Sequence, residues 1–186
     1  IPFIIAAEHG YFAEEGVEVE LVPFKSAMER DAALQSGNLD GAISDLLAVI
    51  FARSGGFAVH AVSYTDGNYN LVAGGDAGIS APADLRGKEI AISRNTIIEY
   101  VTDEILAVNG IEEKEISKVV IPQIPVRLEM LQSGNLGAAV LPEPMASVAA
   151  ASGSRYVTGS GELGINPGVI VFSDASIQEK EASIRA

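Results

Sequence analysis

Short apolar runs alternate with amphipathic, helix-like segments along most of the 186-residue chain. The stretch VEVELVPF alternates apolar and polar positions strictly, which is typical of a half-buried strand. The other runs are short and mainly apolar, as in a sheet that is covered on both faces. The predicted strands span 17–24, 41–44, 57–64, 69–75, 88–93, 118–121, 136–141 and 167–173.

Helix-like segments separate these strands, and several of them begin or end at typical capping residues. Ser26 with Glu29, and Thr96 with Glu99, have the spacing of a capping box, which satisfies N–H groups at a helix start. The predicted helices span 2–15, 26–37, 46–53, 96–109, 124–133, 143–152 and the C-terminal tail. Strands that alternate with helices predict an α/β fold in which helices flank mostly parallel sheets.

The hexapeptide Leu-Gln-Ser-Gly-Asn-Leu occurs twice, at 34–39 and at 131–136. In each copy a predicted helix ends at the glycine, and an apolar strand follows at once. Any helix-to-strand turn favours such residues, so the repeat has a purely local explanation. The alternative is two similar lobes that each deliver the carboxyl end of a strand to one cleft, where open α/β sheets bind ligands.

Motifs in the same order resemble those of a known family. GYFAEEG (10–16) matches a Gly-[Phe/Tyr]-Phe-x-x-x-Gly pattern within a similar opening of 1–45, and APADLRGKEIAIS (81–93) and LPEPMAS (141–147) follow. Arg86 stands where the family usually has lysine. These stretches resemble solute-binding proteins of ABC importers in the nitrate, sulfonate and taurine group, which includes binders of pyrimidine precursors.

The resemblance implies a two-lobed, periplasmic-binding-protein-like fold of type II. Lobe I would hold 1–75 plus 165–186 and lobe II 76–164, with hinge crossings near 74–78 and 159–167. The family's first strand and final helices are missing from this sequence, so both ends look truncated. The implied location is periplasmic or lipid-anchored outside the cytoplasm, with the signal segment absent from this chain.

The implied function is capture of a small polar or anionic solute between the lobes and its delivery to an ABC permease in the membrane, without enzymatic chemistry. Nitrate, a sulfonate or a pyrimidine precursor would each suit this role. Two alternatives stay open: a ligand-sensing module, and an enzyme on the same scaffold, similar to a menaquinone-pathway dehydratase or a pyrimidine-precursor synthase. The synthase would need a lysine where this chain has Ser44, and cysteines where it has none.

The composition of the chain disfavours several classes of binding partner. The formal net charge of −13 disfavours nucleic acid and anionic membrane surfaces, which would repel the chain. No run approaches the ~20 apolar residues of a membrane span, so we expect no direct membrane insertion of this segment. With no cysteine and only two histidines, His9 and His60, far apart in sequence, we expect no metal and no cofactor.

Candidate ligand-binding residues cluster where predicted strands end and helices begin, because free backbone N–H groups there suit polar or anionic groups. We expect the pair Ser44 and Asp45 to face the segment 93–96 across the cleft. Helix capping alone also explains Asp45 and Thr96. The expected ligand-binding residues are Pro2, Phe3, Ser44, Asp45, Ser63, Tyr64, Ser93, Arg94, Asn95, Thr96 and Glu143.

Three of these residues carry particular alternatives. Glu143 begins a helix, and it either caps that helix, binds a ligand amine or pairs with Arg94 across the cleft. The aromatic rings of Phe3 and Tyr64, together with Tyr69, are candidates for pocket walls, although ordinary packing is the commoner role of tyrosine at a strand end.

Overall fold

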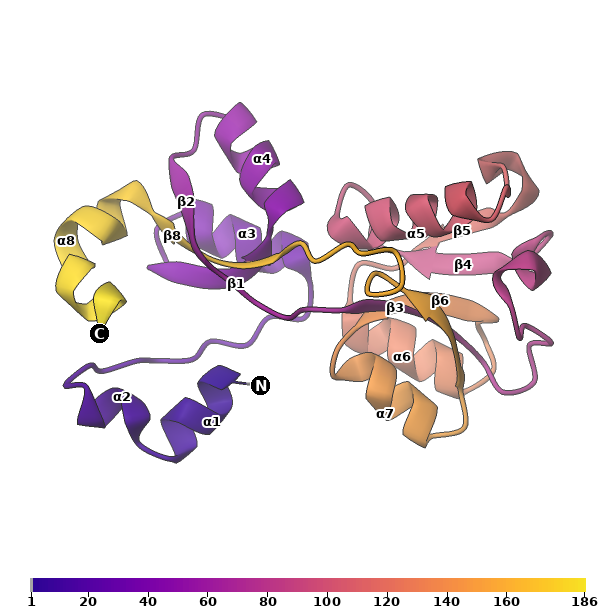
Figure 1. Cartoon of the computed structure of the whole chain (residues 1–186), viewed down its shortest axis with the longest axis horizontal. Coiled ribbons are helices and arrows are strands. Elements are labelled where there is room, and N and C mark those ends of the chain that lie inside the picture. The colour runs from indigo at the N-terminus through magenta and orange to yellow at the C-terminus, as the bar shows by residue number, and fades with distance from the viewer. Residues whose placement is uncertain (1) are drawn as a thin grey trace.

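The computed structural model describes residues 2–186, and its strands form two separate sheets. The three-stranded unit contains β1 (Gly41–Asp45), β2 (Val59–Tyr64), β8 (Gly168–Ser173), α1 (Pro2–Glu8), α2 (Tyr11–Glu14), α3 (Ala27–Gln35), α4 (Leu46–Ser54) and α8 (Asp174–Arg185). The five-stranded unit contains β3 (Tyr69–Ala73), β4 (Glu89–Ile92), β5 (Ser117–Val120), β6 (Ala138–Pro142), β7 (Arg155–Gly159), α5 (Ile97–Val108), α6 (Ile124–Gln132), α7 (Met145–Ala151) and the short 3₁₀ turns η1 (Pro82–Leu85) and η2 (Glu113–Glu115). Figure 1 shows the two units side by side, each with helices packed on its sheet, so the expected α/β class is confirmed.

Neither sheet is mostly parallel: the three-stranded sheet is antiparallel, and the five-stranded sheet is mixed. The strand orders are β1-β8-β2 and β5-β4-β6-β3-β7, and the parallel pairs among residues 2–186 are those of β4 with β5 and with β6. Strands β3 and β8 run antiparallel to every strand that they pair with. Each of them enters its sheet from a segment that crosses between the units, and so starts at the edge where its neighbours end.

The pairing registers show this edge directly. Gly168, the first residue of β8, pairs with Asp45, the last residue of β1. In the other unit, Tyr69 at the start of β3 pairs with Pro142 at the end of β6. The carboxyl ends of the remaining strands therefore point towards the crossing segments from both sides, which is where a shared site can form.

The crossings differ in part from expectation. Because β3 pairs with β6 and β7, residues 69–73 belong to the five-stranded sheet. The first crossing is therefore 65–68 rather than 74–78; the apolar pattern of 69–75 predicts a strand but does not say which sheet it joins. The second crossing, 160–167, follows β7, a strand that the pattern did not predict.

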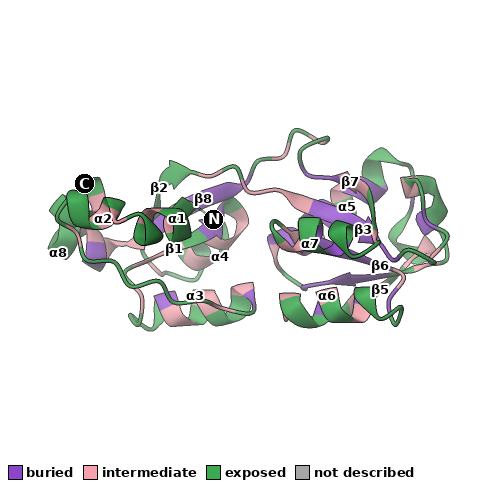
Figure 2. Cartoon of the chain, turned by 90° about the horizontal axis from the view of Figure 1, so that it is seen from below, coloured by how far each residue is buried: buried purple, intermediate pink, exposed green. Residues whose placement is uncertain are grey.

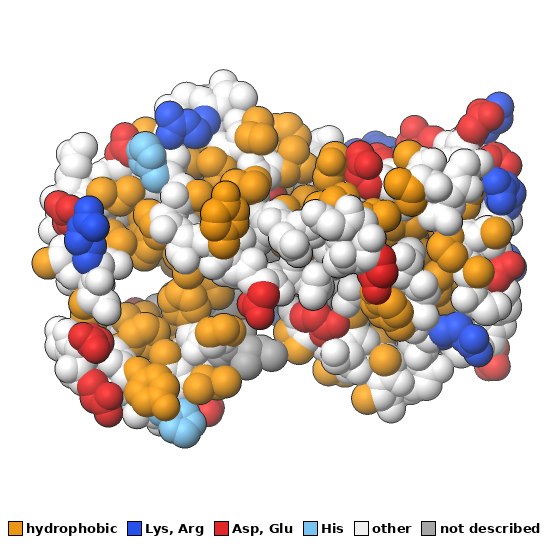
Figure 3. Space-filling view, in the orientation of Figure 1, with side chains coloured by type: hydrophobic (Ala, Val, Ile, Leu, Met, Phe, Trp, Pro, Cys, Tyr) orange, Lys and Arg blue, Asp and Glu red, His pale blue; other side chains and the backbone are white. Residues whose placement is uncertain are grey.

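Two expectations for the N-terminal part are wrong. The helix predicted over 2–15 is split into α1 and α2, because Gly10 takes a left-handed conformation with φ 77°. The segment 17–24 pairs with no strand among the described residues, since alternation alone provides no neighbouring edge to bond to. Neither α1 nor α2 contains a buried residue, and Figure 3 shows a hollow between them and the rest of their unit.

The five-stranded unit holds most of the buried apolar side chains (Figure 2). One cluster around Ile92 and Val101 packs under α5, and another around Leu131 and Leu141 packs under α6 and α7. The buried core of the three-stranded unit consists of Leu34, Val59, Val169 and Val171. Among residues 2–186, no helix is long and apolar enough to cross a membrane.

The repeated hexapeptide has the same local structure in both units. Gly37 and Gly134 end α3 and α6 in the left-handed conformation, with φ 76° and 75°. In each copy the asparagine side chain donates a hydrogen bond of 2.9 Å to the serine hydroxyl two residues before it. The leucine that opens each copy is buried. The same helix–turn–strand unit is thus built once into each sheet, as α3–β1 and as α6–β6.

Candidate functional site

A cavity of about 130 Å³ lies where the two units meet. Asp31 and Asp45 line it from the three-stranded unit, and Asn95 and Thr96 line it from the start of α5. A cavity needs roughly 10–15 Å³ to hold one water molecule, so this one has room for a small solute group. The expected approach of Asp45 to the segment 93–96 is therefore present in the structure.

Asp45 is a buried carboxylate at the start of α4. Its Oδ1 accepts a hydrogen bond of 2.9 Å from the backbone N–H of Ala48, so it caps the helix. Its Oδ2 lies 3.7 Å from Nη2 of Arg30, and the same nitrogen lies 2.7 Å from Asp31 Oδ1, as ion pairs rather than aligned hydrogen bonds. Burial raises the pKa of Asp45, while the Ala48 N–H and the Arg30 charge oppose the shift.

The segment 93–96 is held by hydrogen bonds within its own turn. Asn95 has φ 56°, a left-handed conformation that asparagine tolerates better than most residues. Its backbone N–H donates to Glu99 Oε2 at 2.6 Å. Thr96 Oγ1 donates to the Ser93 carbonyl at 2.7 Å and accepts from the Ile98 N–H at 3.2 Å, which caps α5. The Asn95 and Thr96 side chains are thus presented to the cavity by an ordered turn.

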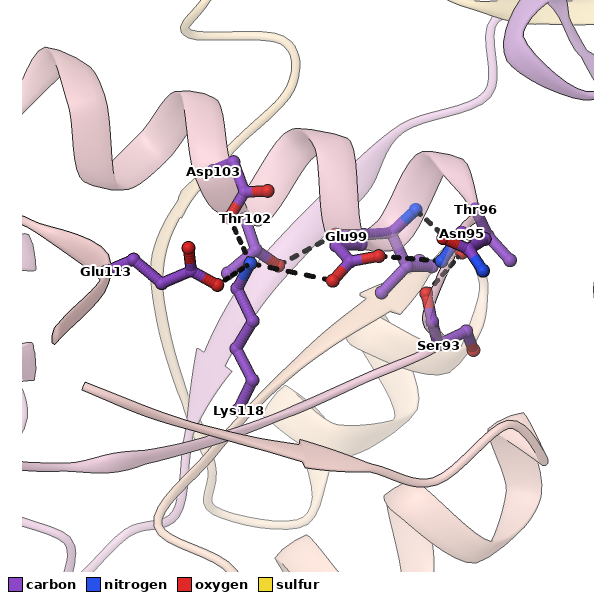
Figure 4. A network of polar contacts seen from close by, with 9 residues as sticks. Ser93, Asn95, Thr96, Glu99, Thr102, Asp103, Glu113 and Lys118 are labelled. Carbon is purple, nitrogen blue, oxygen red and sulfur yellow. Dashed lines mark hydrogen bonds and ion pairs between the residues drawn. The ribbon is translucent and has the colours of Figure 1, made fainter.

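Lys118 anchors this turn from the side of α5 (Figure 4). Its Nζ lies 2.6 Å from Asp103, 2.9 Å from Glu113 and 3.6 Å from Glu99, which in turn holds Asn95. Burial lowers the pKa of Lys118, but the hydrogen bonds to Asp103 and Glu113 outweigh burial and raise it overall. The lysine therefore stays charged and has a positioning role.

Arg127, in the first turns of α6, anchors the other side of the turn. Its Nη1 donates a hydrogen bond of 2.6 Å to Ser93 Oγ, which itself donates to the Pro122 carbonyl at 3.3 Å. The Arg127 side chain is fully buried, and its Nε and Nη2 have no hydrogen-bond partner among residues 2–186. Burial lowers the pKa of Arg127 to about 10.

The other residues predicted for the first unit lie apart from this cavity. Ser44 is buried and lines a smaller cavity of about 20 Å³ between α3, α4 and β8, so Asp45 alone of that pair reaches the shared cavity. Ser63 and Tyr64 are exposed on β2, and the Ser63 hydroxyl donates to the Tyr64 carbonyl. Pro2 and Phe3 lie on α1, where the Phe3 ring packs against Phe12 with ring centres 6.1 Å apart.

Arg94 and Glu143 do not pair with each other, contrary to one of the alternatives. Arg94 is exposed, and its charge lowers the pKa of Glu113, behind the hydrogen bond and charge of Lys118. Glu143 accepts hydrogen bonds from Asn70 at 2.7 Å and from the Ser147 backbone and hydroxyl at 3.2 and 2.7 Å. Its carboxylate therefore has local partners at the start of α7, as in the capping alternative.

Three residues near the site, Tyr69, Arg30 and Arg127, are absent from the predicted ligand-binding residues. Tyr69 is close enough to Asp45 and Arg30 for their charges to act on its phenol, whose pKa burial raises first and Asp45 raises further. Arg30 and Arg127 were not considered, although the sequence carried a signal for both. The repeat extends upstream in register, as RDAALQSGNL and RLEMLQSGNL, with an arginine four residues before the first leucine in each copy.

Comparisons agree with this architecture. The sequence model of the family described as "NMT1/THI5 like" matches residues 1–142. Among curated protein sequences, none matches the chain.

The structure resembles solved structures of solute-binding proteins. The alkanesulfonate-binding protein SsuA from Xanthomonas axonopodis pv. citri, bound to MOPS, gives a TM-score of 0.83 at 17% identity, over 98% of this chain and 65% of that one. The periplasmic aliphatic sulphonate-binding protein SsuA from Escherichia coli gives 0.79 at 18% identity, with the same coverage of 98% and 65%. An ABC transporter periplasmic binding protein from Brucella ovis with glutathione bound gives 0.67 at 17% identity, over 89% and 52%.

These likenesses show the fold, and they confirm the periplasmic-binding-protein-like fold and the resemblance expected from the motifs. The chain spans 65% of the length of the two SsuA proteins, which is slightly less than two-thirds.

Proposed function

The chain belongs to the NMT1/THI5-like family, and on this premise we propose that it captures a small polar or anionic solute between its two units, as the solute-binding part of an ABC importer. The two units act as lobes in this proposal, and the crossings 65–68 and 160–167 act as the hinge. A solute that contacts both lobes favours the closed arrangement, because it binds that state better than the open one. No covalent step is part of this function.

One observation carries the proposal: a single cavity is lined by polar groups from both units. Asp45 supplies a carboxylate and Asn95 and Thr96 supply an amide and a hydroxyl, at the starts of α4 and α5. Both helix starts carry N–H groups and the positive end of the helix dipole towards the strand ends. Such a set can recognise a solute through several hydrogen bonds at once.

The partners and the location follow from the family in this proposal. The two SsuA proteins and the Brucella ovis protein are described as binding an alkanesulfonate, an aliphatic sulphonate or glutathione, and the latter two as periplasmic. We extend from them an extracytoplasmic location and a membrane permease that receives the solute. The solute itself is left to experiment.

A thermal-shift screen tests the proposal. The panel is nitrate, methanesulfonate, MOPS, uracil, glutamine and glutathione, in a buffer that contains no sulfonate. A solute that binds only the native state raises the melting temperature progressively with its concentration. We expect such a rise with at least one member, and no rise with any of them contradicts the proposal.

A matched pair of variants tests the location of the site. Asn95→Gly removes the amide but suits the left-handed backbone, and we expect it to weaken binding by about 0.5–1.5 kcal/mol, the net worth of one hydrogen bond. Asn109→Gly makes the same change at the far end of α5 and serves as the control. Equal affinities of the two variants would place the solute elsewhere.

A further inference from the structure

The two arginines of the extended repeat occupy corresponding places but have different surroundings. Arg30 lies on α3 with the carboxylates of Asp31 and Asp45 beside it. Arg127 lies at the corresponding place on α6, fully buried, with Ser93 as its one side-chain hydrogen-bond partner among residues 2–186.

The sequence explains why the second arginine has no counter-ion among residues 2–186. When the two copies are aligned on the hexapeptide, the place of Asp31 is taken by Leu128, and the place of Asp45 is taken by Pro142. In the second copy, apolar residues therefore stand at the positions of both carboxylates that lie beside Arg30. A buried charge is costly unless it is paired, so this arrangement needs a reason.

The unused part of the guanidinium has a specific shape. Nη1 bonds to Ser93, which leaves Nε and Nη2 on one edge of the planar group. Two parallel N–H donors on such an edge match two oxygens of a carboxylate, sulfonate, nitrate or phosphate group. In a chain of net charge −13, an anion is attracted only where positive charge is locally in excess.

We propose that the Nε–Nη2 edge of Arg127 binds an oxyanion group of the solute, next to the turn of residues 93–96, so that the site selects anionic solutes. This inference rests on the proposed function, and it adds the charge of the solute and the residue that recognises it. Ser93 couples the two parts, because it touches Arg127 and belongs to the turn that presents Asn95 and Thr96.

Access to Arg127 depends on the arrangement of the units. The backbone N–H of Ile124, at the start of α6, donates a hydrogen bond of 2.9 Å to the Lys25 carbonyl of the other unit. The hydrogen bond joins the start of α6, three residues before Arg127, to the other unit. When the units move apart the contact breaks, and the proposal is that the oxyanion then reaches the guanidinium and is enclosed as the units return.

Calorimetry of the whole chain with methanesulfonate and with nitrate, in Tris–chloride buffer, tests this inference. We expect Arg127→Met to weaken the binding of the anion by about tenfold to a hundredfold, as for a lost hydrogen bond to a charged group. Arg127→Lys keeps the charge but loses the two-donor edge, and its affinity should fall between those of the parent and the methionine variant.

Arg155→Met is the matched control, because it removes an exposed guanidinium from β7 of the same unit and changes the net charge equally. We expect its affinity to equal that of the parent. Equal affinities of the parent, Arg127→Met and Arg127→Lys would overturn the inference, since Arg127 would then contact internal water or serve the fold alone.

The screen separates this failure from failure of the function. If uracil binds and neither anion does, the proposed function stands and the inference about charge is wrong. If no member of the panel binds, the proposed function fails and the inference fails with it.

Discussion

The two copies of the repeated unit, α3–β1 and α6–β6, share a backbone but differ in what surrounds them. Their glycine turns, their asparagine–serine hydrogen bonds and their buried leucines correspond residue by residue. The arginine of the first copy lies beside two carboxylates, and that of the second copy lies beside none among the described residues. The shared local sequence thus determines the turn, whereas the residues that the fold places around each arginine determine whether the arginine is paired with a carboxylate.

The same comparison holds for the cores beneath the two copies. Leu131 packs in a cluster of eight buried residues, and Leu34 packs in a cluster of four. The five-stranded unit is therefore the better packed of the two, and the three-stranded unit contains the arginine that is paired with carboxylates. The difference suggests three tests, ordered by the size of the expected effect.

Truncation of the two leucines should show the largest effect. We expect Leu131→Ala to lower the free energy of unfolding by about 4 kcal/mol and Leu34→Ala by about 2.5 kcal/mol, within the usual range for buried leucines. The larger cavity cost follows from the denser surroundings of Leu131. Urea unfolding of both variants, followed by circular dichroism, measures the difference. A larger loss for Leu34→Ala would reverse our ranking of the two cores.

Replacement of the two arginines should change stability in opposite directions. Arg30→Met leaves the Asp45 carboxylate buried beside Asp31, and we expect a loss of about 2 kcal/mol. Arg127→Met removes a buried cation that lacks a counter-ion, and in solute-free protein we expect a gain of about 1 kcal/mol. Melting temperatures in chloride buffer give both signs. A loss for Arg127→Met as large as that for Arg30→Met would show that Arg127 is already satisfied.

The pH dependence of stability tests the role of Asp45 in the first copy. Because burial raises its folded-state pKa above the ordinary value near 3.8, the folded protein binds more protons than the unfolded chain just above that pH. The stabilisation that results from this proton on Asp45 is fully present below the unfolded-state pKa. It is lost as the pH rises through the raised folded-state pKa. Asp45→Asn, which keeps a capping side chain, lacks this loss.

We therefore expect the stability of Asp45→Asn relative to the parent to improve by less than about 1 kcal/mol between pH 4 and pH 7, because Arg30 and the Ala48 N–H oppose the shift. Unfolding in urea at a series of pH values measures the change. A relative stability that worsens with rising pH would mean that the ion pair, not burial, dominates at this site.

Much of the fold could be predicted from the sequence, because its pattern is local. Capping residues, apolar runs and glycine stops gave most helices and strands to within a few residues. The direction of β3 and β8 and the sheet that β3 joins could not be predicted, since these depend on where the crossings run. The strand predicted over 17–24 does not form for a similar reason, because a strand needs the edge of a neighbouring strand to pair with.

The candidate site could be predicted in part. Asp45, Asn95 and Thr96 follow from strand ends and helix starts, and they line one cavity. Glu143 and Arg94 have other partners, because their positions depend on distant residues such as Asn70 and Glu113. Arg127 lies inside α6, beyond the helix start, where no local rule marks a binding residue, and only the upstream extension of the repeat pointed to it.

The distance between the units with and without solute tests the central proposal most directly. The chain has no cysteine, so spin labels can be attached at Ser54→Cys on α4 and Val108→Cys on α5, both exposed. Pulsed electron–electron double resonance then reports the distribution of distances between the two labels, one on each unit. The account predicts a shorter and narrower distribution once a solute from the screen saturates the protein. An unchanged distribution at saturation would contradict a solute held between the two units.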